Sequence, residues 1–190
     1  MAFTILSANL ISAGGAASLS ITGIPSSYSA LRLVFEFQPE ATGTLDDLEV
    51  EIRFNGLTTG NSTTNAWSTV FNETNGWQNS GGAYAPLAYT TARTGTTGNG
   101  YGVLAHMWGT NYMTDYKNSG YVDIYEYANT TANTIVNSFY QCANLGSGYY
   151  AAVGSVGNCF DTAAAVSSIQ LPMNTGDIAQ YSTFDLYGVE

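Results

Sequence analysis

The chain has 190 residues, of which 45 % are hydrophobic and only 9 % are charged, and its formal net charge is -10. Nucleic acids and anionic membrane surfaces both select basic proteins, so this acidic balance disfavours them as partners. A basic protein surface remains compatible with the charge.

Length and composition together predict one domain with a sizeable core. The charged fraction is well below the roughly 25 % of an ordinary soluble domain. Ser, Thr, Asn and Gly supply the polarity instead, beside 14 Tyr, 8 Phe and 3 Trp. This composition is typical of strands and turns. The first residues lack a positive region followed by an apolar run, so we expect no signal peptide, and no apolar stretch approaches the length of a bilayer span.

Alternation of apolar and polar residues predicts strands along most of the chain. The clearest case runs from Leu48 to Phe54, where four apolar residues alternate with two glutamates and an arginine. Asn55-Gly56 follows, and both residue types tolerate the positive φ of a tight turn. In chain order, the same reasoning predicts nine strands, at 3–6, 18–22, 31–38, 48–54, 101–108, 121–127, 134–142, 166–171 and 182–188. Weaker patterns at 66–71 and 149–153 are compatible with two further short strands.

These elements predict an all-β fold, an antiparallel β-sandwich that is jelly-roll-like and has long loops. No window shows an amphipathic helix of about ten residues or more. Roughly eight to ten short strands with Gly/Asn turns are typical of such sandwiches. We expect a single domain over 1–190, in which 1–15 form an N-terminal arm and 57–100 form a long loop insertion.

Charged residues lie on the expected solvent-facing sides of two of the predicted strands, and they are Arg32, Glu36, Glu49, Glu51 and Arg53. If strands 31–38 and 48–54 pair antiparallel, an arginine can lie opposite a glutamate and form an exposed ion pair. We interpret these side chains as solvated sheet surface.

The segment 57–100 is the most promising place for a contact surface. Long ordered loops are uncommon unless they are functional, and large aromatic side chains recur at binding hot spots. We therefore predict an interface formed by the N-terminal arm or by the long loop, with Phe3, Ile5, Trp67, Phe71, Trp77, Tyr84 and Tyr89 as the candidate residues. Two other interpretations of the loop aromatics stay open, namely packing onto the core and stacking on sugars.

Motifs for catalysis, cofactors and metals are weak. The single histidine, His106, lies in an apolar strand between Ala105 and Met107, and no G-x-S-x-G motif is present. Residues 146–151 match a loose dinucleotide-binding pattern, but no helix is predicted after them, so a hairpin turn is the better interpretation. The acidic residues near Asp46 do not have the spacing of a calcium loop. We predict no enzyme, no cofactor and no metal site.

Two cysteines, Cys142 and Cys159, are present. They are either buried reduced thiols or a bridge between two strands, and the geometry must decide.

Four sets of residues resemble small virion proteins of tailed bacteriophages. The first is Ser18 to Pro25 followed by Tyr28, and the second is the F-N-G element at 54–56. The third is 122–130, which is similar to an I-x-x-Y-A-N-T segment, and the fourth comprises 169–171 and 182–189, which end in Leu-Tyr-Gly. Segments 57–100 and 109–120 have no counterpart and would carry partner specificity.

The resemblance implies a structural virion protein, most plausibly a capsid decoration (cement) protein. Such a protein would bind the major capsid protein on the outer surface of the head, often as a homotrimer, after assembly in the bacterial host cytoplasm. No catalytic residues are implied. The alternative is a tail or fibre component that recognises a host surface glycan, and a carbohydrate-active enzyme is a third hypothesis.

Overall fold

A computed structural model describes residues 2–40, 48–56, 68–78, 84–94, 102–107, 117–144, 150–160, 164–173 and 176–190. All the regular elements among these residues are strands, as the alternation of the sequence predicts. They are β1 (Phe3–Leu10), β2 (Ser18–Thr22), β3 (Ala30–Phe37), β4 (Pro39–Glu40), β5 (Leu48–Phe54), β6 (Ser68–Gln78), β7 (Tyr84–Thr94), β8 (Gly102–Met107), β9 (Asn118–Tyr125), β10 (Thr134–Asn144), β11 (Tyr150–Phe160), β12 (Ser168–Pro172), β13 (Asp177–Ile178) and β14 (Thr183–Val189).

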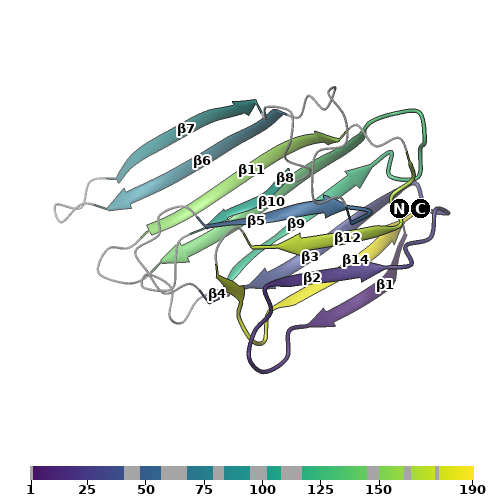
Figure 1. Cartoon of the computed structure of the whole chain (residues 1–190). Coiled ribbons are helices and arrows are strands. Elements are labelled where there is room, and N and C mark those ends of the chain that lie inside the picture. The colour runs from purple at the N-terminus through teal and green to yellow at the C-terminus, as the bar shows by residue number, and fades with distance from the viewer. Residues whose placement is uncertain are drawn as a thin grey trace.

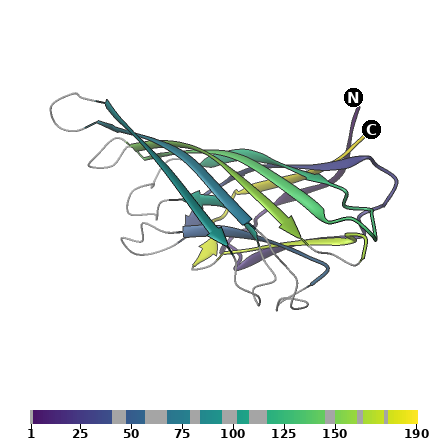
Figure 2. The same ribbon diagram turned by 90° about the horizontal axis from the view of Figure 1, so that it is seen from above.

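The strands form an antiparallel β-sandwich. The large sheet has eight strands in the order β1-β14-β3-β9-β10-β11-β6-β7, and the small sheet has four in the order β2-β12-β5-β8. The two sheets lie over one another as layers, and β4 and β13 form a short ribbon beside them (Figures 1 and 2). The predicted all-β antiparallel fold is therefore confirmed, whereas the strand order does not confirm a jelly-roll-like connectivity.

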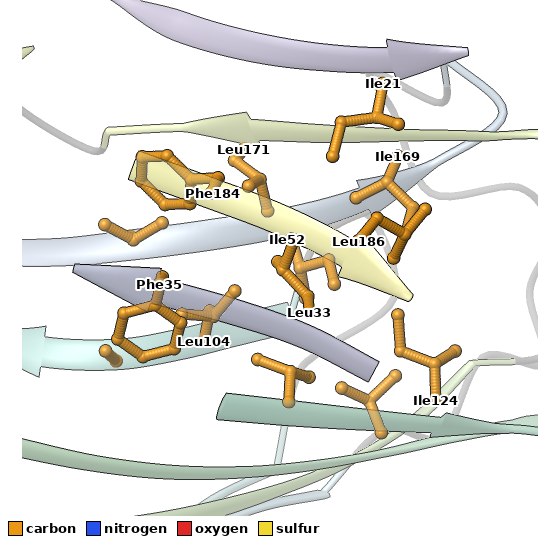
Figure 3. Close-up of a cluster of buried hydrophobic side chains, with 14 of the residues drawn as sticks. Ile21, Leu33, Phe35, Ile52, Leu104, Ile124, Ile169, Leu171, Phe184 and Leu186 are labelled. Atoms are coloured by element: carbon orange, nitrogen blue, oxygen red, sulfur yellow. The ribbon is translucent and has the colours of Figure 1, made fainter. Parts of the chain in front are cut away.

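The core lies between the two sheets. Every second residue of β3, from Leu31 to Phe37, is at most 2 % exposed and faces the small sheet. On the facing sheet, Val50, Ile52 and Phe54 of β5 are buried. This confirms the prediction that the apolar residues of that strand lie on one buried face. Figure 3 shows side chains of both layers interdigitating, with Ile21, Ile52, Leu104, Ile169 and Leu171 from the small sheet and Leu33, Phe35, Ile124, Phe184 and Leu186 from the large sheet.

The turn after β5 anchors that strand to β12. Asn55 and Gly56 have φ of 54° and 69°, as the Asn-Gly sequence predicts. The Asn55 Oδ1 atom accepts hydrogen bonds from the backbone N–H groups of Ser167 (2.8 Å) and Ser168 (3.3 Å), and its Nδ2 atom donates to the Ala165 carbonyl (3.1 Å). One side chain therefore fixes both the turn and the start of β12.

The predicted N-terminal arm is wrong, because most of it is a strand of the large sheet. β1 pairs with β14 over its whole length, with a register shift between Ile5 and Ser7. The reason is that Phe3, Ile5 and Leu10 suit an open sheet surface, and the chain end β14 supplies a partner that lies far away in the sequence.

The predicted long loop insertion at 57–100 is also wrong for much of its length. β6 and β7 pair with each other over eleven positions, and β6 continues the large sheet from β11. Figure 1 shows both strands at the side of the large sheet that extends past β8. Thr- and Asn-rich sequence concealed this hairpin, because the pattern of apolar residues on which the strand predictions depend is weak there.

Candidate interaction surface

The outer face of the large sheet, which is the face turned away from the small sheet, concentrates exposed apolar side chains. Eight large hydrophobic residues are exposed in the described part of the chain, and seven of them lie on this face. They come from β1, β3, β9 and β10, and they are Phe3, Ile5, Leu10, Val34, Tyr125, Ile135 and Phe139. A single exposed hydrophobic residue is ordinary, but a group on one sheet face marks a candidate interaction surface.

The register of the strands sets these side chains in rows across the sheet. Val34 of β3 lies opposite Tyr121 of β9, which lies opposite Phe139 of β10. The neighbouring row crosses five strands, and its members are Ile5, Tyr187, Arg32, Asp123 and Asn137. The rows place an ion pair among aromatic and aliphatic residues.

The ion pair is formed by Arg32 and Asp123, which face each other directly in the register. Arg32 Nε and Asp123 Oδ1 are 2.6 Å apart, and Arg32 Nη2 and Asp123 Oδ2 are 2.8 Å apart, so the contact is bidentate. The hydrogen bond to Asp123 is the main reason why the pKa of Arg32 is raised above its ordinary value, so the guanidinium stays charged. The two charges neutralise each other at the centre of the face.

Aromatic rings enclose this pair. The Arg32 Cζ atom lies 4.5 Å from the ring centroid of Tyr121 and 5.4 Å from that of Phe3, both within cation–π range. Phe3 also meets Tyr187 edge to face at 6.4 Å, and Tyr121 packs on Phe139 at 5.2 Å. The outer face is therefore a connected aromatic stripe from β1 to β10 with an arginine inside it.

Tyr125 extends the stripe along β9 and lies opposite Ile135 of β10. Burial raises the pKa of the Tyr125 hydroxyl, and the neighbouring Asp123 carboxylate raises it further. The hydroxyl lies 3.4 Å from Asp123 Oδ2 and donates to it. The phenol therefore stays neutral and adds no charge to the surface.

A hollow of about 280 Å³ opens on the same face between β9 and β10. Its lining combines three aromatic residues with two polar residues and two glycines, namely Ser119, Gly120, Tyr121, Phe139, Tyr140, Gln141 and Gly154. Gly120 is required for the close packing beneath it, because a Cβ there would lie 2.2 Å from the Phe139 carbonyl oxygen. The Gln141 side chain donates a hydrogen bond to Ser119 at 2.9 Å along the polar wall.

The structure separates the residues predicted for the interface into two groups. Phe3 and Ile5 lie on the outer face at β1, and they are 46 % and 56 % exposed. The other described members are at backbone positions of β6 and β7, at the opposite side of the large sheet, and they are Phe71, Trp77, Tyr84 and Tyr89. Six strand spacings of about 4.8 Å separate β1 from β6, which is about 29 Å. Trp67 lies outside the described residues.

The centre of the surface was missed by the sequence prediction. The sequence predicts strands over the segments that contain Tyr121, Tyr125, Ile135 and Phe139, but it does not show that these four side chains share the outer face. The available signal was that β10 carries apolar residues on both faces, for example Val136 inside and Ile135 outside. A strand that is apolar on both faces in an antiparallel sheet indicates a second contact surface.

The condition for pairing charges between strands 31–38 and 48–54 is not met, because β3 and β5 belong to different sheets. Arg32 pairs with Asp123 instead. Arg53 Nη2 lies 2.7 Å from Glu51 Oε2 on the same strand, and Glu36 Oε1 lies 2.8 Å from Lys117 Nζ. The alternation predicted which side of each strand is polar, but it does not contain the order of strands. The interpretation as solvated sheet surface is wrong for Glu51, which is only 5 % exposed beside Arg53.

The two cysteines are too far apart for a disulfide. They lie on neighbouring strands, where Cys142 is opposite Ala152 and Cys159 is opposite Ile135. Seven residues of β11 separate Ala152 from Cys159, which is about 23 Å of strand. A disulfide requires Cα atoms within about 7 Å, so the interpretation as two thiols is favoured, and Cys159 is a free thiol.

The weak motifs of the sequence have structural explanations. Tyr150 and Ala151, the described part of the pattern at 146–151, begin β11, which pairs antiparallel with β10, so a strand stands where a dinucleotide site needs a helix. His106 lies on β8 opposite Glu49. Among the described residues, no group of three or more His, Cys, Asp or Glu could hold a metal ion. Asp46 lies outside the described residues.

No protein-family model matches the chain, and comparisons with curated proteins and with solved structures gave no match. Within the described ranges, the chain has no helix with the length and apolarity needed to cross a membrane.

Proposed function

We propose that this chain is a structural protein of a bacteriophage particle, a decoration (cement) protein that binds the outer surface of the major capsid protein lattice and stabilises the head. The observation that carries the proposal is the outer face of the large sheet. It offers a connected aromatic and aliphatic stripe on a sheet scaffold, which suits a protein that acts by adhering to another protein surface.

The chemistry of the outer face supports a protein partner. Aromatic residues and arginine are the residues that most often dominate binding free energy at protein interfaces. Arg32 is already paired with Asp123, so a partner need not supply a counter-charge when it covers the centre of the face. Burying an unpaired charge would oppose binding, and this arrangement avoids that cost.

The charge of the chain supports the choice of lattice surface over nucleic acid. The net charge of -10 repels DNA and attracts a partner whose rim is basic. The four sets of residues that resemble virion proteins of tailed phages support the particle as the place of action. They include 122–130, which covers the second half of β9 and the turn after it.

Removal of one ring from the stripe tests the proposal. Phe139→Ala takes away a side chain that is 45 % exposed, so the fold should be kept while attachment to purified capsids of the cognate phage weakens. We expect a loss of about tenfold or more in affinity, as for a residue at the centre of an interface. Co-sedimentation with capsids that lack the protein measures it.

Tyr181→Asn is the matched control. Tyr181 is also large and 63 % exposed, but it lies off the outer face, and its φ of 66° is one that asparagine tolerates. This variant should attach like the unaltered protein. Equal attachment of both variants would contradict the outer face as the contact surface.

A second function is favoured by the hollow between β9 and β10. Tyr121 and Phe139 present rings beside the polar groups of Ser119 and Gln141, which is how sugars are commonly bound. A tail or fibre component that recognises a host surface glycan would use this hollow. Binding on a glycan array that is lost in Phe139→Ala, with no attachment to capsids, would favour this function.

A further inference from the structure

β1 forms an open edge that lacks the usual protection against strand pairing. In the described part of the large sheet it is the outermost strand, with β14 on one side and no described strand on the other. Edge strands present unpaired N–H and C=O groups, and charged residues or proline usually discourage pairing there. The opposite edge, β7, carries Pro86 and Arg93, whereas the β1 sequence FTILSANL has neither charge nor proline.

Two hydrogen bonds show which backbone groups of β1 point to the open side. The Ala2 carbonyl accepts from the Glu190 N–H at 3.1 Å, and the Ile11 N–H donates to the Ser182 carbonyl at 2.9 Å. The backbone groups of Ala2 and Ile11, which flank β1, therefore face the side on which β14 lies. Successive residues of a strand point their backbone groups to alternate sides. The groups of Phe3 and Leu10 therefore point to the open side.

The same alternation extends inward from both ends of β1. The register is regular from Phe3 to Ile5 and from Ala8 to Leu10, and the shift lies between these two runs. Ile5 and Ala8 therefore also direct their backbone groups to the open side. The four open-side residues are placed symmetrically about the centre of the strand.

This symmetry makes the strand complementary to itself. In an antiparallel pair with a second β1, Phe3 lies opposite the partner's Leu10, and Ile5 lies opposite the partner's Ala8. Each pair joins two open-side residues on the outer face, and the register shift of each strand falls at the twofold axis. All four side chains are apolar, so their pairing also covers exposed surface.

We propose that β1 pairs antiparallel with β1 of a second copy of this chain, which gives a twofold dimer with one continuous sheet. Isologous twofold contacts are the commonest symmetric interfaces. A second copy is favoured over a basic partner because β1 is neutral in a chain of net charge -10, so its edge is where two copies repel least. The dimer replaces the trimer that the phage resemblance implies, and it does not depend on the proposed function.

Sedimentation equilibrium of the purified chain without capsids tests the dimer. The expected mass is twice the 20.1 kDa of one chain. Ile5→Pro removes an N–H that points to the open side, so it should spare the bonds between β1 and β14 and remove one bond per copy from the dimer. The dissociation constant of the dimer should increase by about tenfold to a hundredfold, which is the effect of losing two hydrogen bonds.

A second variant and a control keep the test decisive. If Ile5→Pro loses its circular dichroism spectrum, Leu10→Lys replaces it, because that side chain is 64 % exposed and lies at the pairing edge. Val34→Lys makes the same charge change on the outer face away from the edge and should stay dimeric. A monomer or a trimer for the unaltered chain would overturn the proposal. So would a dimer that Leu10→Lys leaves intact or that Val34→Lys weakens equally.

Discussion

Tyr127 joins the loop before β3 to the turn after β9. Its side chain is completely buried in the core, and its hydroxyl donates to the Pro25 carbonyl at 2.7 Å and accepts from the Tyr28 N–H at 3.2 Å. Tyr127→Phe removes both hydrogen bonds and keeps the ring. We expect the free energy of unfolding to fall by about 1–3 kcal/mol, measured by guanidinium unfolding.

The same hydroxyl should make stability depend on alkaline pH. Burial raises the pKa of Tyr127 above 10.0 in the folded chain, so the folded state holds this proton more tightly than the unfolded state does. The contribution is therefore complete below pH 10.0 and is lost as the pH rises through the folded pKa. The stability difference between the unaltered chain and Tyr127→Phe should be constant below pH 10.0 and shrink as the pH rises above it. A difference that grows over this range would contradict the assignment.

Two strand glycines should respond oppositely to alanine. A Cβ at Gly120 would lie 2.2 Å from the Phe139 carbonyl oxygen and 2.7 Å from the Phe35 ring, and neither can move freely. A Cβ at Gly157 would meet its nearest described neighbour, Asn137 Oδ1, at 3.8 Å. Gly120→Ala should destabilise by about 1–3 kcal/mol or more, and Gly157→Ala should be nearly neutral. Thermal unfolding of both variants compares them directly, and equal midpoints would disprove the predicted crowding at Gly120.

At the scale of elements, the alternation of apolar and polar residues was sufficient to locate a strand where one of its faces is apolar and the other polar. It predicted β2, β3, β5 and β12 closely, because burial on one side imposes the period of two. It could not predict that β1 pairs with β14 or that β3 and β5 lie in different sheets, because those contacts join residues far apart in the sequence. It also missed β7, whose Thr-rich sequence lacks a clear alternation.

The candidate surface was predicted only in part, for the same physical reason. Phe3 and Ile5 were named because they are apolar and near the chain start. Tyr121 and Phe139 were not, because only the register of β9 with β10 shows that their rings meet on one face. A prediction from sequence alone identifies which residues are apolar and does not say which of them become neighbours.

The register of β10 and β11 also makes a prediction about the cysteines. Because Cys142 and Cys159 are separated by about 23 Å along the paired strands, they should stay unbonded even in an oxidising buffer. Titration in denaturant without reductant should find two thiols per chain. Finding none in monomeric protein would mean that this strand pairing is incorrect.

At the scale of the whole molecule, the excess of negative charge should govern the rate of attachment. The chain has 14 acidic and 4 basic residues, and Arg32, Arg53 and Lys117 are each ion-paired. If the partner surface is basic at its rim, association with capsids should slow as salt rises from about 0.05 M to about 0.5 M, because screening removes the steering field. Stopped-flow scattering measures this rate. A rate that does not change with salt would leave the apolar stripe as the sole attraction.

The central claim is that the protein covers the phage head, and its copy number tests this most directly. Quantitative mass spectrometry of purified virions gives the ratio of this chain to the major capsid protein. A decoration protein predicts a ratio near parity, since it binds throughout the lattice. A ratio of a few per cent would contradict decoration and indicate a tail or fibre component, and absence from the particle would contradict both.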